Sequence, residues 1–244
     1  MDEDPLLEFL IAQNAPKSER YLAFENRQNE RFAKYGWDFV SDATAHTIFE
    51  SVVRPSINDF LCVKKGVFVK QINEDVSHII TFKQGRYGHV FGWGVSLSFL
   101  PHKWDEDGCK FHRTPKSARR DLFENETNLI KDDPETKLFP YNEMDINHGT
   151  VCFFDDLMRA WENLQPVIRN WLGSITTLDG VLKEARFQID NREWDGPKLV
   201  YSFTLARIGQ YEKGLAVLDQ LMVQHSYYAS PELPKALQKI AGTR

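Results

Sequence analysis

The sequence predicts an α+β fold, in which a small antiparallel sheet of three to four strands packs on helices and a helical C-terminal region follows. Three observations support this class. Apolar residues recur at helical spacing over residues 42–60, alternate with small or polar residues over 68–101, and return to helical spacing from residue 155 onward. Helices and strands that are segregated along a chain are typical of α+β proteins.

The same patterns divide the chain into three regions. Residues 1–41 form an N-terminal helical extension, in which Ser18 caps a helix over 19–35. Residues 42–154 form the α+β domain, which carries an insertion at 102–148, and residues 155–244 form a helical region packed on it.

The first core helix begins at Asp42 or Thr44, either of which can cap it, and Pro55 is expected to kink it or to start its last turn. Its buried stripe is apolar and follows the three-and-four spacing of one helical face. The residues of this stripe are Ala45, Ile48, Phe49, Val52, Val53, Ile57 and Phe60.

Three strands follow this helix. Residues 68–73 and 76–83 are rich in β-branched residues and predict a hairpin around Glu74 and Asp75. A third strand lies between residues 89 and 101. There, bulky residues alternate with glycine and serine: the bulky ones are Phe91, Trp93, Val95, Leu97 and Phe99, and the small ones are Gly92, Gly94, Ser96 and Ser98. The bulky face should be buried in a core.

The small face of this strand has two interpretations. Helix packing or a β-bulge is the structural one, because glycine permits both. The functional one is a cleft that admits a ligand close to the sheet. The residues that would line such a cleft are His78, Arg86, His89, Gly92, Gly94 and Ser96.

The insertion at 102–148 shows no sustained periodicity, although a helix over 117–130 and a further strand over 150–154 are expected at its end. Long irregular segments are often functional. We expect this one to be a mobile surface that binds a partner. Its apolar anchors would be Trp104 and Phe111, and its charged contacts Arg113, Arg119 and Arg120.

The remaining helices are expected over residues 155–172, with Pro166 bending this helix or dividing it in two, and over 178–189, 198–208, 211–223 and 231–240. Gly209 marks a turn between the third and fourth of them. The residues around this turn, Gly209-Gln210-Tyr211 with Ala206 and Ala216 on either side, resemble the turn of a tetratricopeptide repeat. A full repeat has about 34 residues and several repeats form a solenoid, so the resemblance implies only a helical hairpin that buries one face.

A second resemblance lies in the middle of the chain. The helix at 45–60, the strand pair at 68–83 and the segment from Trp93 to Pro101 follow one another in an order that is similar to bacterial proteins grouped as domain of unknown function 4304. The phrase His78-Ile79-Ile80-Thr81-Phe82-Lys83-Gln84 belongs to the same similarity. This resemblance implies an α+β fold and brings no catalytic residues.

Composition limits the classes of function. The 244 residues carry a formal net charge of -5, and three widely spaced cysteines form no CxxC pair, which argues against a disulfide framework and favours a reducing cytoplasm. The sequence has no segment of about 18 uninterrupted apolar residues, so we expect no membrane span. The basic cluster from Lys110 to Arg120 is followed by acidic residues, and a solvated, salt-bridged face is the preferred interpretation of it over a nucleic-acid site.

No catalytic or cofactor motif stands out. Cys109 and His112 have the spacing of two metal ligands, but a structural zinc site needs a second pair, so we expect no metal and no other cofactor. The glycines from Gly85 to Gly94 lead into a strand, whereas a phosphate-binding loop precedes a helix. A Gly-x-Ser-x-Gly elbow is also missing.

The leading hypothesis from the sequence is therefore a cytoplasmic, non-catalytic module that binds protein, for example an inhibitor or immunity-type factor. Two alternatives stay open. One is an enzyme or small-ligand binder that uses the small face of the strand at 91–99, and the other is a nucleic-acid-associated accessory protein that uses the basic cluster.

Overall fold

The computed structural model describes residues 41–84, 89–105, 107–111, 114–125, 150–192 and 194–242, together with a few residues nearer the N-terminus. These earlier residues are helical and exposed: Leu22, Asn26, Asn29, Glu30 and Ala33. The rest of the helix expected over 19–35, and its cap Ser18, lie outside the described residues.

The chain divides into two compact units, each built from three stretches of sequence. Unit 1 comprises Met1–Ser56, Lys83–Val90 and Asn125–Asn163. Unit 2 comprises Ile57–Phe82, Phe91–Glu124 and Leu164–Arg244.

The main sheet has five strands in the order β1-β2-β3-β4-β7, which confirms the predicted α+β class and adds to the predicted number of strands. The predicted strands are β2 (Val67–Gln71), β3 (Val76–Gln84) and β4 (His89–Leu97). The sequence did not indicate β1 (Leu61–Lys64) or β7 (Leu122–Asn125). The helix expected over 117–130 is wrong at β7, because pairing with β4 outweighs the local helical preference there.

The alternation along β4 is confirmed by burial. Phe91, Trp93, Val95 and Leu97 are fully buried, and Phe99 beyond the strand is nearly so. The antiparallel register of β2 with β3 pairs Val67 with Thr81 and Val69 with Ile79, which places these residues on one face of the sheet. Val67, Val69 and Ile79 form a small apolar cluster there, against which Val63 and Ala118 pack.

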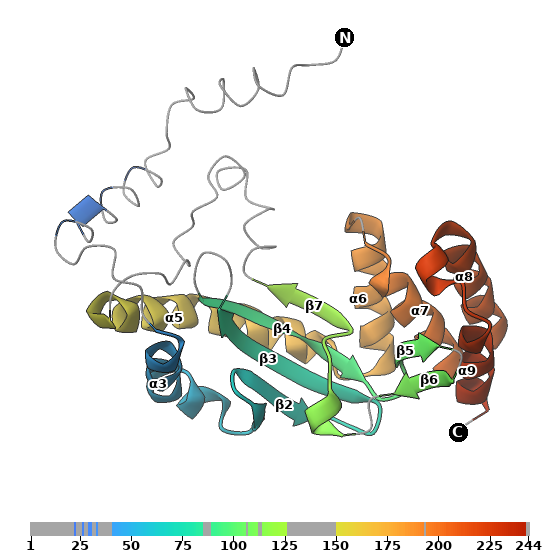
Figure 1. Ribbon diagram of the computed structural model, residues 1–244, viewed down its shortest axis with the longest axis horizontal. Coiled ribbons are helices and arrows are strands. Elements are labelled where there is room, and N and C mark those ends of the chain that lie inside the picture. Colours follow the sequence, from blue (N-terminus) through green and yellow to red (C-terminus); the bar gives the residue numbers. More distant parts are fainter. Residues whose placement is uncertain are drawn as a thin grey trace, which may run out of the picture. The chain divides into compact units, whose positions relative to one another are not determined.

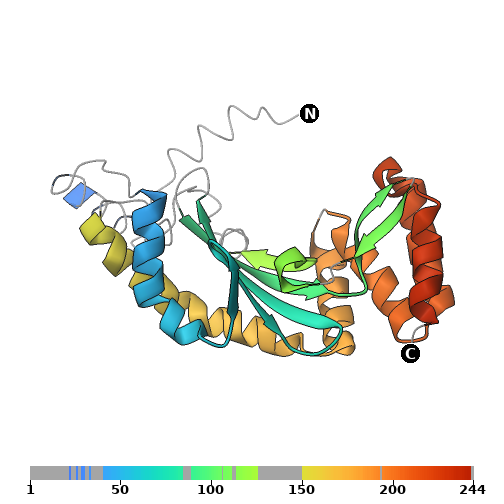
Figure 2. The same ribbon diagram turned by 60° about the horizontal axis from the view of Figure 1, so that its bottom comes forward.

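A second, two-stranded sheet lies at the start of the insertion, where the sequence pattern indicated no strand. Strand β5 (Pro101–Asp105) pairs antiparallel with β6 (Gly108–Phe111). The turn between them needs Gly108, whose φ of 103° lies in the region that side chains disfavour. Helix α9 (Glu232–Ala241) packs on both strands (Figures 1 and 2).

In unit 1, helix α3 (Asp42–Val52) begins one residue after its cap, which is Ser41 and not Asp42 or Thr44. The Ser41 side chain accepts a hydrogen bond from the backbone N–H of Thr44 at 3.1 Å, because the cap residue must precede the first helical turn. The helix ends before Pro55, and a short 3-10 turn, η1 (Arg54–Ile57), follows.

Helix α5 (Thr150–Ser174) corrects two expectations. Residues 150–154 belong to this helix and do not form a strand, so the long helix overrides the β-branched and aromatic character of its first residues. Pro166 lies inside the helix and does not divide it, since a proline removes only one backbone donor from the ladder.

The C-terminal helices of unit 2 follow the predicted order. They are α6 (Leu178–Asn191), α7 (Gly196–Arg207), α8 (Tyr211–Gln224) and α9, with a 3-10 turn, η3 (Ser226–Tyr228), before the last one. Helix α7 packs against the other three. Gly209 forms the predicted turn between α7 and α8 with a φ of 86°, and Ser202 donates a hydrogen bond to the carbonyl of Gly214 where these helices meet.

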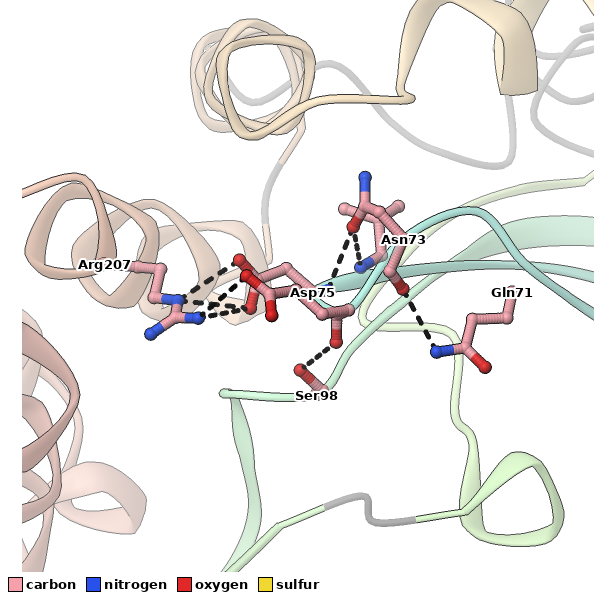
Figure 3. Close-up of polar contacts among 7 residues, drawn as sticks. Gln71, Asn73, Asp75, Ser98 and Arg207 are labelled. Carbon is pink, nitrogen blue, oxygen red and sulfur yellow. Dashed lines mark hydrogen bonds and ion pairs between the residues drawn. The ribbon is translucent and has the colours of Figure 1, made fainter. Parts of the chain in front are cut away.

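A polar cluster ties the β2–β3 turn to the end of α7 (Figure 3). Asn73 accepts hydrogen bonds from the backbone N–H groups of Asp75 and Val76, which fixes the turn. Arg207 then makes a forked contact with the Asp75 carboxylate, donating from Nε at 3.1 and 3.2 Å.

None of the helices in the described part of the chain combines the length and the apolar composition that crossing a membrane requires.

Candidate functional site

The β5–β6 hairpin presents Trp104, the residue that the sequence favoured as a partner contact. Trp104 lies opposite Cys109 in the hairpin and is half-buried. Its indole Nε1 donates a hydrogen bond to the backbone carbonyl of Tyr227 at 3.1 Å. The indole N–H is therefore satisfied within the chain, and the ring itself remains as the contact surface.

Three aromatic rings meet at this place. Trp104 stacks on Tyr228 with centroids 5.6 Å apart, and Tyr227 stands edge-on to both rings at 5.3 and 5.0 Å. Such geometries stabilise aromatic pairs. Burial raises the pKa of the Tyr228 hydroxyl, with smaller contributions from Asp195 and Tyr227, whereas the side chain of Tyr227 is 71% exposed.

A pocket of about 530 Å³ adjoins the cluster. Its walls come from β5, from η3 and from the start of α9, and they combine aromatic, small and charged groups. The lining residues are Lys103, Trp104, Asp105, Tyr227, Ala229, Ser230, Pro231 and Glu232. Its volume is within the range of pockets that bury a side chain or a small molecule.

Two carboxylates of the pocket are held by lysines. Asp105 lies 3.0 Å from the Lys103 ammonium and 3.9 Å from that of Lys110. Its bond to Lys103 lowers the pKa of Asp105 and raises that of Lys103. Glu232 accepts a hydrogen bond from Lys235 at 2.7 Å through Oε1. The Asp105 carboxylate is thus ionised at neutral pH.

Cys109 lies on the neighbouring strand with its thiol 3.5 Å from the Glu232 carbonyl. Burial raises the pKa of this thiol, and the charges of Glu232 and Asp105 raise it further. A thiol in this setting stays protonated at neutral pH and is a poor nucleophile or metal ligand. His112, its expected partner, lies outside the described residues.

Of the other residues expected to bind a partner, Phe111 pairs with Pro101 at the far end of the hairpin. Arg119 is exposed and donates to the His102 carbonyl at 2.9 Å. Arg113 lies outside the described residues. Among the members of this group that the structure describes, only Trp104 lines the pocket.

Arg120 belongs instead to the small face of β4. A Cβ on Gly92 would overlap the Arg120 guanidinium, and one on Gly94 would overlap the carbonyl oxygen of Leu122. Ser96 accepts a hydrogen bond from the backbone of Arg119. The chain itself therefore covers this face at both glycines, through Arg120 and strand β7 and not through a helix, which argues against a ligand cleft at these positions.

The histidines expected at that cleft contact residues far away in the sequence. His78 is buried and its Nε2 lies 3.0 Å from the Ile175 carbonyl, and burial lowers its pKa. In unit 1, His89 and His46 each place Nε2 3.4 Å from Oδ1 of Asp42. Arg86 lies outside the described residues. Within the part of the chain that the structure describes, no group of three or more His, Cys, Asp or Glu side chains is arranged to hold a metal ion.

Sequence reasoning missed the second wall of the pocket. Tyr227 and Glu232, which belong to this wall, follow helix α8, and the hydrogen bond from Trp104 to Tyr227 spans 123 positions. One local signal was present, because two adjacent tyrosines lie in the short link before Pro231, where no core pattern explains them.

A comparison of this chain with protein-family models, with curated proteins and with solved structures found no match.

Proposed function

We propose that this protein is a non-catalytic protein-binding module, and that its docking site is the pocket beside Trp104 and Tyr227. The observation that carries the proposal is that the exposed Tyr227 and the half-buried Trp104 contact each other edge-to-face and line the same pocket. Tryptophan and tyrosine dominate the energetics of protein interfaces, because each buries a large rigid surface.

The neighbouring groups fit the same role. Pro231 and Ala229 add apolar wall, whereas Lys103, Asp105 and Glu232 add charge, and this mixture is typical of an interface with an apolar centre and a polar rim. Cys109, the nearby thiol, has a raised pKa and offers no reactive group. An inhibitor or immunity-type factor is one form that such an acidic module would take.

A cytoplasmic location belongs to the same proposal. Cys62 is an exposed free thiol and Cys109 is a second free thiol. Exposed thiols persist in reducing compartments, whereas oxidising ones favour disulfides.

Binding of a small molecule is a second candidate function, because the pocket volume of about 530 Å³ is also sufficient for one. Such a ligand would contact the pocket alone, whereas a protein partner would also contact the surface around it.

The experiment is an affinity capture of partner proteins from cell extract, in which the tagged wild-type protein is compared with the variants Tyr227→Ala and Phe187→Ala. Phe187 is the matched control, because it is an exposed aromatic residue on α6 that does not line the pocket. The partner is the protein that binds to wild type and to Phe187→Ala but not to Tyr227→Ala. It is identified by mass spectrometry and purified.

Calorimetric titration of that purified protein decides the proposal. Tyr227→Ala should weaken its binding by about tenfold or more, which is the loss of about 1.4 kcal/mol expected for an aromatic contact. Equal affinity for all three variants would contradict the pocket as the docking site. Small molecules that bind the pocket in the absence of any protein partner would support the second function instead.

A further inference from the structure

The pocket has an acidic wall beside its aromatic one. The side chains of Asp105 and Glu232 are 31% and 25% exposed, so both carboxylates are partly withdrawn from water. Trp104 and Tyr227 line the same pocket. Aromatic faces and carboxylates share one preference, which is for a cation.

The lysines that hold these carboxylates are far more exposed. Lys103, Lys110 and Lys235 are 59%, 54% and 68% exposed. Ion pairs made by such mobile, hydrated ammonium groups are weak. An incoming cation with better geometry can therefore replace a lysine at either carboxylate, and the displaced ammonium returns to water at little cost.

Glu232 also keeps one oxygen available. Its Oε1 accepts from Lys235, whereas Oε2 makes no hydrogen bond or ion pair with the described residues and lies on the side of Gly108, 3.9 Å from where a Cβ on that glycine would stand. Because Gly108 has no side chain, no Cβ of that residue faces this oxygen.

From this arrangement we infer that the pocket receives an arginine side chain of the protein partner. A guanidinium is planar, stacks on aromatic rings and donates two parallel hydrogen bonds to a carboxylate. The Trp104 and Tyr227 rings would contact its plane, and Glu232 with Asp105 would accept its hydrogen bonds. A lysine ammonium is not planar and cannot stack on the rings in this way. An apolar side chain would offer the carboxylates no hydrogen-bond donor.

This inference rests on the proposed function, since it names the group that the docking site recognises. The chain's net charge of -5 suits a partner with a basic segment.

The test uses four blocked pentapeptides of sequence Gly-Gly-X-Gly-Gly, in which X is arginine, lysine, citrulline or leucine. Binding to the full-length protein is followed by nuclear magnetic resonance of the indole N–H groups, with Trp104 assigned by its loss in Trp104→Phe. The arginine peptide should shift the Trp104 signal and bind about fivefold or more tightly than the other three. Citrulline is the critical comparison, because it keeps the planar shape and removes the charge.

Two variants locate the recognition. Glu232→Gln should weaken binding of the arginine peptide by about three- to tenfold, because a hydrogen bond to a charged group is lost while the shape of the side chain is kept. Asp190→Asn is the matched control, because it removes one exposed carboxylate on α6, and it should leave the affinity unchanged.

The outcomes separate this inference from the proposed function. Equal binding of the arginine and citrulline peptides, stronger binding of the leucine peptide, or no binding of any peptide would overturn recognition of arginine. In each of those cases, a partner protein whose binding still depends on Tyr227 would continue to support the pocket as the docking site. Free arginine that binds about tenfold or more tightly than the peptide would also overturn the inference, because the pocket would then recognise the free amino and carboxylate groups of a small molecule.

Discussion

The Asp121 carboxyl group, directly before β7, joins this part of the chain to strand β4. Its Oδ2 accepts a hydrogen bond from the backbone N–H of Leu97 at 2.7 Å, and its own N–H donates to the Val95 carbonyl at 2.8 Å. Burial raises the pKa of Asp121 to about 7, although the bond from Leu97, the charge of Arg119 and the Ser96 hydroxyl all oppose the shift. The folded protein therefore retains this proton at pH values where the unfolded chain has lost it.

The free energy of unfolding should consequently fall as the pH rises from about 4 to about 7, because the folded state binds more protons there. Asp121→Asn keeps the acceptor for Leu97 and carries no charge. At pH 8 this variant should be more stable than wild type by roughly 1 to 3 kcal/mol, and near pH 4 the difference should vanish. Urea unfolding at several pH values measures this. Parallel pH profiles for the two proteins would show that Asp121 does not titrate as described.

Gly94 and Gly173 give opposite predictions for the same substitution. A Cβ on Gly94 would meet a backbone oxygen of β7, whereas a Cβ on Gly173 in α5 has no neighbour within 4 Å. Gly94→Ala should destabilise the protein by about 1 to 3 kcal/mol through overpacking. Gly173→Ala should stabilise it by up to about 1 kcal/mol, because alanine favours the helix. Thermal unfolding of both variants tests the packing, and a neutral Gly94→Ala would refute the close approach of β7.

The two described thiols should differ in reactivity. Cys62 is exposed, while Cys109 is half-buried with a raised pKa. Since the thiolate is the reactive form, a maleimide at pH 7 should label Cys62 at least about tenfold faster than Cys109. Mass spectrometry of digested samples gives the two rates, and Cys109→Ser serves as the control for assignment. Faster labelling of Cys109 would contradict its position against α9.

At the scale of elements, the ion pair of Asp75 with Arg207 holds the β2–β3 turn against α7. Both side chains are largely buried, at 13% and 18% exposure. Removing one partner leaves a poorly solvated charge, so Asp75→Ala should cost about 2 to 4 kcal/mol of unfolding free energy. The exposed pair of Arg186 with Asp190 within α6 is the control, and Asp190→Ala should cost no more than about 0.5 kcal/mol. Equal costs in chemical denaturation would mean that burial does not strengthen the first pair.

Long periodic elements were predictable from the sequence, and short paired ones were not. The alternation in β4 and the spacing in α8 each run through a whole element, so they identify its type and its buried face. Strands β5, β6 and β7 have only four or five residues each, and their stability comes from a partner strand that local pattern does not reveal. The strand expected over 150–154 failed for the converse reason, because a helix of 25 residues includes it.

One side of the candidate site was predictable from the sequence, and the other was not. Trp104 was expected as a contact because a large aromatic residue in a charged segment has no core pattern to explain it. Tyr227 and Glu232 complete the pocket from a distant part of the chain. Their proximity is a property of the tertiary fold, and no spacing rule connects residues that far apart.

At the scale of the whole molecule, the net charge of -5 adds a long-range term to partner binding. A basic partner should associate faster at low ionic strength, because the acidic chain attracts it before contact. Raising salt from about 0.05 to about 0.5 M should slow association by roughly tenfold and change dissociation less. Stopped-flow kinetics with the identified partner checks this, and an association rate that is independent of salt would argue against a basic partner.

The interleaving of the two units along the chain has a consequence for biosynthesis. Unit 2 contains Ile57–Phe82 and Phe91–Glu124, but it also needs Leu164–Arg244, which leave the ribosome much later. Since domains complete their folding as units, β2 and most of β3 and β4 emerge long before α6, α7, α8 and α9. During that interval their apolar side chains are exposed to the cell. The nascent chain is therefore expected to depend on chaperones until the last helices have been translated.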